Sequence, residues 1–430
     1  MIIEFTLKNF RSIKEEQVFS LYADKKPKHH AGNIAYFDEK IGVLKTTAIY
    51  GANASGKTNL IFAFEALKTL VVKSGDWKDG DLINVYEPHL LSNDTKNAPT
   101  RFEIEFFVKN DRFSYQVEFN EKNILFEKLD HFKTVKPSNM FTRNSPDDWR
   151  SVKFGDSYKG GKRQFSFFSN NTYFSKAGNS PESPPFMREL YNYFREGLIT
   201  LSANESIGVL NWENKPGLKN VMNAFLCKAD FGIKSFDFEK GDIPKELNFP
   251  DDMPSDIREE FTNEFSRKVI FHHKSDFGDL VPFERRMESR GTDRIFRLVP
   301  IFIMVFDVGA TLFIDEIEAS LHPHIAELII KLFNDPTVNT NNAQLIFTTH
   351  NMSLMSQNVL RKDQVYLSMK SQDKGTEYMC LDDFDSSLKD SSPFAKWYDE
   401  GRFGGIPEIN YRDISYAIKE AIEHAQKEEE

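Results

Sequence analysis

The chain has 430 residues, of which 40% are hydrophobic and 13% aromatic, so it can bury a large core and is long enough for two or three domains. Its formal net charge of −10 excludes a general basic field, and any nucleic-acid contact would therefore need a local basic patch. Cys227 and Cys380 lie far apart without zinc-ligand spacing, which favours a reducing compartment. The first residues carry charges where a secretion signal would be apolar, so we expect a cytoplasmic protein with no membrane span.

The first strong motif spans residues 46–72. The run TTAIY is typical of a buried strand, GANASGKT of a glycine loop, and NLIFAFEALKTLVV has apolar residues at helical spacing. Between a strand and a helix start, such a loop directs backbone N–H groups at one phosphate, while its lysine reaches the β- and γ-phosphates and its threonine ligates Mg²⁺. The motif therefore predicts an ATP and Mg²⁺ site made by Gly51, Asn53, Ser55, Gly56, Lys57, Thr58 and Asn59.

The long interval between this loop and the next motif predicts two lobes separated by an insertion. Residues 1–135 are expected to form the first lobe, with alternating strands such as FEIEFFV. Residues 136–230 are rich in Ser, Asn, Pro and Gly and then show helical patterns, which predicts a mostly helical arm without coiled-coil heptads. Residues 231–380 are expected to form the second lobe, and residues 381–430 a tail ending in a charged, solvated helix.

Segment 131–163 is locally basic. Its basic residues outnumber its acids and alternate with aromatic ones: Lys133, Lys136, Arg143, Arg150, Lys153, Lys159, Lys162 and Arg163 stand with Trp149, Phe154 and Tyr158. Such side chains can neutralise phosphates and stack on bases. A solvated loop is the default interpretation, and a nucleic-acid contact and a docking surface for a protein partner stay open.

The second motif is ATLFIDEIEASLHP. Its apolar strand delivers Asp315 and Glu316 at the carboxyl end, after a buried helix and a turn at Gly309. In a P-loop ATPase the first carboxylate orients Mg²⁺ and the second polarises the attacking water. We therefore expect Asp315 to serve as a metal ligand and Glu316 as the general base.

A third apolar strand, AQLIFTTHN, ends near His350. Because the carboxyl ends of parallel strands meet at one edge of a sheet, His350 is expected beside the γ-phosphate as a catalytic residue. A glutamine loop is not assigned, since Gln116 and Glu127 are both candidates.

The motifs LKNFRSI, GANASGKTN, FIDEIEASLHP and IFTTHN together resemble the ABC-class ATPases of the SMC, Rad50, RecF and OLD type. The ending WYDEGRFGGIPEI is similar to the branch found in bacterial phage-defence and abortive-infection systems, such as RloA-like ATPases and the ATPase subunit of PARIS. The resemblance implies an α/β P-loop NTPase fold, an ABC-type ATPase head in two lobes that hydrolyses ATP.

The resemblance also implies that two heads pair head to tail, as a dimer or larger homo-oligomer. The matching signature is ESRGTDRIFRL, in which Ser289 and Gly291 would close the neighbour's nucleotide, although it departs from the usual Leu-Ser-Gly-Gly pattern. Ser320 matches the loop that communicates between heads, and Arg11 matches an arginine placed near the nucleotide. A simple helix cap and a surface arginine are the structural alternatives for Ser289 and Arg11.

Two functions from different classes are compatible with these motifs. The first is a defence sensor and scaffold that answers a phage-encoded trigger and controls a separate effector, a Toprim-like nuclease, because the stretch after His350 shows no acidic Toprim signature. The second is a RecF- or SMC-like ATPase that binds DNA in repair. A metabolic P-loop kinase is the third, since it needs neither the signature nor the EASLHP segment.

Overall fold

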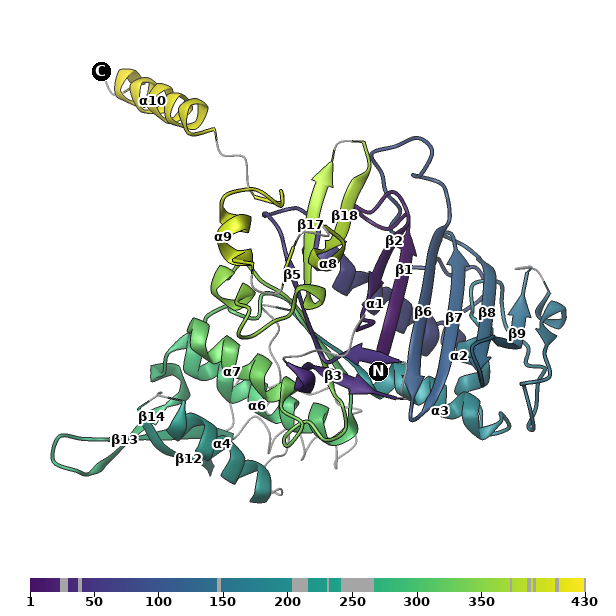
Figure 1. Cartoon of the computed structure of the whole chain (residues 1–430), viewed down its shortest axis with the longest axis horizontal. Coiled ribbons are helices and arrows are strands. Elements are labelled where there is room, and N and C mark those ends of the chain that lie inside the picture. The colour runs from purple at the N-terminus through teal and green to yellow at the C-terminus, as the bar shows by residue number, and fades with distance from the viewer. Residues whose placement is uncertain are drawn as a thin grey trace, which may run out of the picture.

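The computed structural model describes residues 1–23, 30–37, 41–144, 148–202, 216–229, 232–240, 267–371, 373–384, 388–389, 392–406 and 410–428. Figure 1 shows an antiparallel sheet at one side of the molecule and helices α4, α6 and α7 at the other. A second sheet, which contains β5 and β17, lies between them.

The larger sheet is antiparallel and has the strand order β10-β9-β8-β7-β6-β1-β2. Its strands are β1 (Ile2–Lys8), β2 (Gln17–Ser20), β6 (Thr100–Val108), β7 (Asp111–Phe119), β8 (Ile124–Phe132), β9 (Ser138–Arg143) and β10 (Lys153–Phe154). Along β6, Phe102, Ile104 and Phe106 are buried and the residues between them are partly exposed. This period of two places one apolar face of the sheet against the core.

The second sheet has the order β11-β15-β16-β5-β17-β18, and only the β17–β18 pair is antiparallel. Its strands are β5 (Thr46–Tyr50), β11 (Leu198–Leu201), β15 (Thr311–Ile314), β16 (Gln344–Thr348), β17 (Val365–Ser371) and β18 (Gly375–Cys380). Every residue of β5, β15 and β16 is buried, as expected for parallel strands covered on both faces. Their carboxyl ends therefore open at one common edge.

Helix α1 (Lys57–Lys73) joins the two sheets. The Phe64 ring stacks on Phe5 of β1, with ring centroids 4.2 Å apart, and meets Phe313 of β15 at 4.5 Å. Helices α2 (Tyr173–Gly178) and α3 (Pro185–Glu196) belong to the same hydrophobic core. This core holds the start of α1 against the parallel sheet.

A second core covers the other face of the parallel sheet. It contains residues of α4 (Pro216–Lys228), α6 (Arg290–Val308), α7 (Pro323–Asn334), β12 (Ile233–Lys240) and β13 (Arg267–Lys274). The more exposed β14 (Leu280–Glu284) pairs with β13 and completes this antiparallel sheet. The expected order of buried helix, turn and strand is confirmed, because Gly309 ends α6 in a left-handed conformation (φ 67°) directly before β15. A short β3 (Ile34–Tyr36) and β4 (Gly42–Leu44) pair completes the strands of the described ranges.

The segment expected as a mostly helical arm, residues 136–230, contains strands as well as helices. Strands β9 and β10 extend the antiparallel sheet, and β11 pairs with β15 in the parallel sheet. Polar composition suggested an arm, yet Asn170 and Asn171 are buried and donate to backbone carbonyls of residues 74–81. These polar side chains stabilise a core edge. The helical patterns expected within the segment are present as α2, α3 and α4. Residues 145–147, 203–215 and 230 of the expected arm lie outside the described part.

The expected tail is divided between a packed part and an exposed part. Helix α8 (Leu381–Phe384) and α9 (Phe394–Asp399) adjoin the second core, where Phe394, Tyr398 and Phe403 are buried. Helix α10 (Tyr411–Glu428) projects away from the body (Figure 1) and its described side chains are almost all exposed. Across the described ranges, no helix has both the length and the apolar content needed to cross a membrane.

Candidate functional site

The glycine loop between β5 and α1 is pressed against β17 and β18. A Cβ atom at Gly56, whose φ is 104°, would lie 2.4 Å from Thr376 Oγ1, and one at Gly51 would lie 2.5 Å from the Ser368 carbonyl oxygen. Only glycine fits these two positions without a shift of the neighbouring strands. The hydroxyls of Thr376 and Ser368 both donate to the Ser55 carbonyl oxygen, at 2.8 and 3.0 Å, so strands late in the chain hold the loop in shape.

Lys57, the first residue of α1, points into this loop. Its side chain is buried, and Nζ donates to the carbonyl oxygens of Gly51 and Ala52, both at 2.9 Å. Burial lowers the pKa of Lys57. Three acids oppose this shift of the pKa: Asp315, Glu316 and Glu318. The ammonium group is thus enclosed by the loop that is expected to surround a phosphate.

The loop fits an anionic ligand. Ser55 Oγ is buried and has no hydrogen-bond partner within the described residues, and Lys57 keeps a third N–H beyond the two that the loop carbonyls accept. Asn53 lies exposed at the loop tip. A phosphate group would satisfy these donors, and no protein acceptor in the described ranges does so for Ser55.

Thr58 and Asp315 lie together although 257 positions separate them. The Thr58 hydroxyl is 3.0 and 3.2 Å from the two carboxylate oxygens of Asp315. The Thr348 hydroxyl, at the end of β16, donates to Asp315 Oδ1 at 2.6 Å and accepts from the Glu316 backbone N–H at 2.8 Å. A hydroxyl and a carboxylate held this way are the hard oxygen donors that suit Mg²⁺.

Thr348 is a site residue that the sequence motifs did not single out. Its only signal in the sequence is a polar side chain at the end of an apolar strand, beside the His350 motif. In the structure it connects β16 to the acidic pair after β15.

Glu316 follows β15 with its side chain exposed and its backbone in the left-handed region, at φ 50°. A non-glycine residue in this region is strained by about 1–3 kcal/mol, and such strain gathers at functional sites. The Glu316 carbonyl oxygen accepts a hydrogen bond from Arg294 Nη2 of α6 at 3.1 Å. Burial lowers the pKa of Arg294, and the nearby acids oppose this shift. Sequence reasoning missed Arg294, whose partner became visible only in the folded chain.

His350 and Glu318 connect the ends of β16 and β15. The His350 backbone N–H donates to Glu318 Oε1 at 2.6 Å, whereas Glu318 Oε2 is buried and makes no hydrogen bond to the described residues. Partial burial and the nearby Lys57 lower the pKa of the His350 imidazole, and acids oppose this shift. A lowered pKa keeps the ring neutral near pH 7, so one ring nitrogen can donate and the other accept. Glu318 was not among the predicted residues, and its position two residues after Glu316 was the available signal.

Arg11 borders the same region from the first lobe. Its guanidinium lies 3.9 Å from the Phe62 ring centroid on α1 and 2.5 Å from a Glu87 carboxylate oxygen. The next residue, Ser12, accepts through Oγ from Asn59 Nδ2 at 2.6 Å. Arg11 and Ser12 also line a cavity of about 460 Å³. Arg11 is therefore beside α1, and its role toward a nucleotide stays a prediction.

The two predicted signature residues lie at the start of α6. Ser289 caps the helix, because its Oγ accepts from the Thr292 backbone N–H at 3.0 Å. A Cβ atom at Gly291 would lie 2.8 Å from the carbonyl oxygen of Ser320, which has a positive φ of 60°. Ser289 is exposed and therefore accessible to another molecule. The other predicted site residues, namely the P-loop, Asp315, Glu316 and His350, come together within one chain.

Glu127, one candidate for the glutamine loop, has a structural role. It is fully buried, and its carboxylate accepts from the backbone N–H groups of Tyr173 and Phe174 at the start of α2, at 2.7 and 2.8 Å. The Tyr115 hydroxyl and Arg143 are its other neighbours. Burial raises the pKa of Glu127, and these partners oppose the shift.

A glycine loop after β5, an acidic pair after β15 and a histidine after β16 gather at one edge of a parallel sheet that is flanked by an antiparallel sheet. This arrangement defines a mixed α/β P-loop ATPase head of the ABC class. Residues 46–356 match the family model described as "AAA domain, putative AbiEii toxin, Type IV TA system". That match covers more than half of the chain, and the chain belongs to this family.

Two solved structures are similar to this chain at 13% sequence identity. The SMC head domain from Thermotoga maritima has a TM-score of 0.40 and covers 88% of this chain and 98% of its own. The recombination mediator protein RecF-ATPrS in the RecFOR pathway has a TM-score of 0.38 with the same coverage. No curated protein sequence matches the chain.

Proposed function

We propose that this protein binds ATP with Mg²⁺, hydrolyses it slowly, and uses nucleotide-dependent pairing of two heads to control a separate toxic effector in anti-phage defence. The observation that carries the proposal is the contact of Thr58 with Asp315, which joins the P-loop to the acidic strand end. Membership of the family whose model is described as an AAA domain supports the nucleotide part of the proposal.

Each site residue has a specific part in this function. The backbone from Gly51 to Asn59 and the Lys57 ammonium hold the phosphates, and Thr58 with Asp315 holds Mg²⁺, which neutralises charge on them. The exposed Glu316 carboxylate accepts a proton from the attacking water, and the neutral His350 ring contacts the γ-phosphate. Thr348 and Glu318 are positioning residues that hold Asp315 and the His350 backbone.

The second head supplies the remaining contacts in this proposal. Ser289 and Gly291 stand at the exposed start of α6, where backbone N–H groups and the helix dipole favour an anion. In a head-to-tail pair they close the neighbour's nucleotide. ATP then stabilises the paired arrangement, because a ligand favours whichever state it binds more tightly.

Mixing two inactive variants tests this composite site. A Lys57→Ala chain and a Ser289→Arg chain are each expected to lack ATPase activity, but a mixed dimer contains one P-loop and one signature that are both intact. Random exchange should therefore restore roughly a quarter of the wild-type turnover, since half the dimers are mixed and each has one working site. Steady-state phosphate release measures it.

Mixing Lys57→Ala with itself is the control, and circular dichroism checks that Ser289→Arg still folds after losing its helix cap, a change worth about 1 kcal/mol. Absent activity in a mixed dimer verified by native mass spectrometry would contradict the composite site.

We further propose that the protein belongs to the defence branch of RloA-like and PARIS ATPases, with a nuclease as the separate effector and a phage product as the trigger. The purified protein is then expected to leave DNA and RNA intact in the presence of ATP and Mg²⁺ or Mn²⁺. Co-expression with its genomic neighbour should arrest growth, and Lys57→Ala should relieve the arrest because ATP binding drives head pairing. Gel assays and growth curves measure the two outcomes. A nuclease activity that co-purifies with this chain alone, and is lost on substitution of one of its own acids, would contradict the separate effector.

A further inference from the structure

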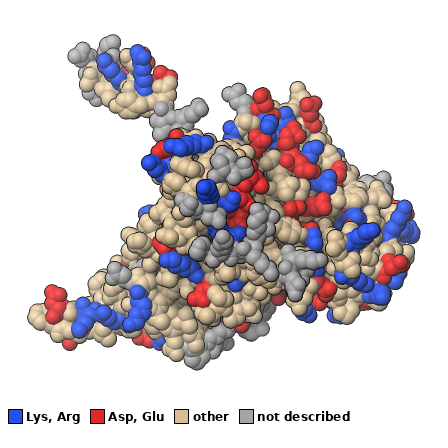
Figure 2. Space-filling model, in the orientation of Figure 1, with Lys and Arg blue, Asp and Glu red and all other residues tan. Residues whose placement is uncertain are grey.

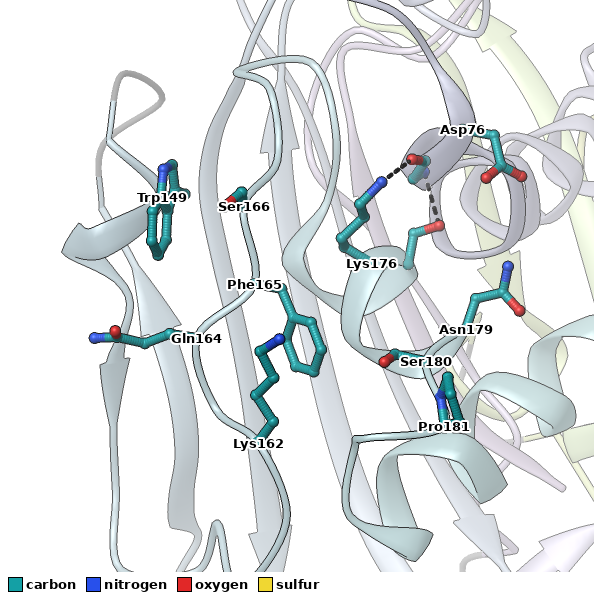
Figure 3. A pocket seen from close by; sticks show the side chains of 12 residues that line it. Asp76, Trp149, Lys162, Gln164, Phe165, Ser166, Lys176, Asn179, Ser180 and Pro181 are labelled. Atoms are coloured by element: carbon teal, nitrogen blue, oxygen red, sulfur yellow. Dashed lines mark hydrogen bonds between the residues drawn. The ribbon is translucent and has the colours of Figure 1, made fainter.

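A second cavity, of about 620 Å³, lies at the opposite end of α1 from the P-loop. It is formed by the residues after α1, the segment 149–166 and helix α2 (Figure 3). Because α1 has 17 residues and rises about 1.5 Å per residue, the two sites are separated by about 25 Å. We name this cavity the flank pocket, and its lining includes Asp76, Trp149, Lys162, Phe165, Lys176 and Asn179.

Aromatic rings accompanied by cations line one side of the flank pocket. In Figure 3 Trp149 and Phe165 both come from segment 149–166. The Arg150 guanidinium lies 4.6 Å from the Trp149 ring, and Lys162 Nζ lies 5.3 Å from the Phe165 ring centroid. Phe165 is largely buried and Trp149 is partly exposed. Trp149 therefore offers the more accessible ring on which a flat π-system can stack.

Two lysines provide positive charge around these rings. Lys176 Nζ donates to the Gly75 carbonyl oxygen at 2.9 Å, which occupies one of its three N–H groups. Lys162 pairs with Glu182 at 2.6 Å, and the exposed fractions of these side chains are 47% and 60%. An ion pair so exposed is worth at most about 1 kcal/mol, so a phosphate group can replace Glu182 as the partner of Lys162.

The charge of the surrounding surface favours an anionic polymer. Described residues 148–163 contain five cations and two acids: Arg150, Lys153, Lys159, Lys162 and Arg163 against Asp148 and Asp156. Figure 2 shows Lys and Arg side chains gathered at the end of the molecule where β9 lies in Figure 1. Asp76, on the other side of the pocket, disfavours a bare phosphate there, but its carboxylate can accept from a base amino group or a sugar hydroxyl.

We propose that the flank pocket binds a nucleotide unit of single-stranded nucleic acid. The base stacks on Trp149, and the phosphate contacts Lys162 and Lys176. Asp76 and Asn179 lie where they can hydrogen-bond the base edge or the sugar. A base paired within a duplex is already stacked between its neighbours and cannot enter such a pocket, so the ligand is an unpaired strand. The site is independent of the proposed ATP site.

Fluorescence anisotropy with labelled single strands of about 12 uridines or thymidines tests the proposal, with the full chain carrying Lys57→Ala so that the P-loop takes no nucleotide. Trp149→Ala should weaken binding about tenfold, the effect of losing one stacked base. Lys162→Gln should weaken it and lower the slope of affinity against salt concentration by about one. Tyr411→Ala and Lys396→Gln are matched controls, because these side chains are 78% and 71% exposed on α10 and α9, and they should change nothing.

Competition with uridine monophosphate distinguishes a free nucleotide from a nucleic-acid strand as the ligand of the flank pocket. Displacement of the strand by the free nucleotide, sensitive to Trp149→Ala, would support the pocket as a nucleotide site, and displacement only by longer strands would support it as a strand site. Equal affinity of Trp149→Ala and Tyr411→Ala for the strand, or no strand binding at all, would overturn the proposal. ATPase activity of the Trp149→Ala chain with an intact Lys57 should be unchanged, so either failure is distinguishable from a failure of the ATPase proposal.

Discussion

Replacing Lys57 with alanine is expected to abolish measurable ATP binding. The Lys57 ammonium is buried in the P-loop, where it donates to the backbone carbonyl oxygens of Gly51 and Ala52. Removing a charge-assisted hydrogen bond to phosphate costs about 3 kcal/mol, which corresponds to a loss of affinity of at least about 100-fold. Isothermal titration calorimetry with ATP and Mg²⁺ measures the loss.

Lys73→Ala is the matched control for this substitution, because Lys73 is exposed at the far end of the same helix. It should bind ATP as the wild type does. Thermal unfolding of Lys57→Ala shows whether the loop keeps its shape without the two hydrogen bonds to its carbonyls. An affinity equal to that of the wild type in a folded Lys57→Ala chain would refute the phosphate-loop assignment.

Glu316→Gln is expected to keep ATP binding and to lose turnover by about 10²–10⁴-fold, the range for removal of a general base. Glutamine preserves the shape of the side chain but cannot accept the proton of the attacking water. The Glu316 carboxylate is exposed, and Arg294 of α6 donates to the Glu316 backbone carbonyl oxygen. The substitution leaves this contact in place, so the loop geometry should survive the change. Single-turnover hydrolysis and nucleotide titration together separate binding from chemistry.

Glu377→Gln, on the half-exposed acid of β18 that pairs with Lys374, is the control and should hydrolyse ATP normally. Slow hydrolysis should also prolong the ATP-bound pairing of Glu316→Gln heads, which size-exclusion chromatography with ATP can detect. Undiminished hydrolysis by Glu316→Gln would remove this residue from the role of base. Glu318, the acid that holds the His350 backbone, would then be the next candidate.

Local sequence was sufficient for the elements that carry the site. The strand, loop and helix of residues 46–72, and the helix, turn and strand of residues 298–314, were predicted from neighbouring residues and are confirmed. Glycine conformations and apolar periodicity act over a few residues, so they can be recognised without a partner segment. The rule that parallel strands end at one edge then predicted the meeting of the Lys57, Asp315 and His350 loops.

The prediction of a mostly helical arm missed strands β9, β10 and β11, because composition says little about strand pairing. Residues 138–143 form β9 beside β8, and the buried Asn171 is satisfied by backbone carbonyls of Ser74 and Trp77, nearly a hundred positions earlier. A polar side chain with buried partners looks the same in a sequence as one in solvent. Strand order therefore decided which polar segments belong to the core.

By itself the sequence determined the α/β P-loop class, the positions of the phosphate loop and the acidic pair, and the family of ATPases that the chain resembles. Only the tertiary structure decided that Thr348 holds Asp315, that Glu318 holds the His350 backbone, and that β17 and β18 support the phosphate loop. The phosphate loop and the acidic pair are encoded by local backbone geometry, whereas these supporting contacts join residues 32 to 321 positions apart. Contacts over such separations exist only once the strand order has brought their partners together.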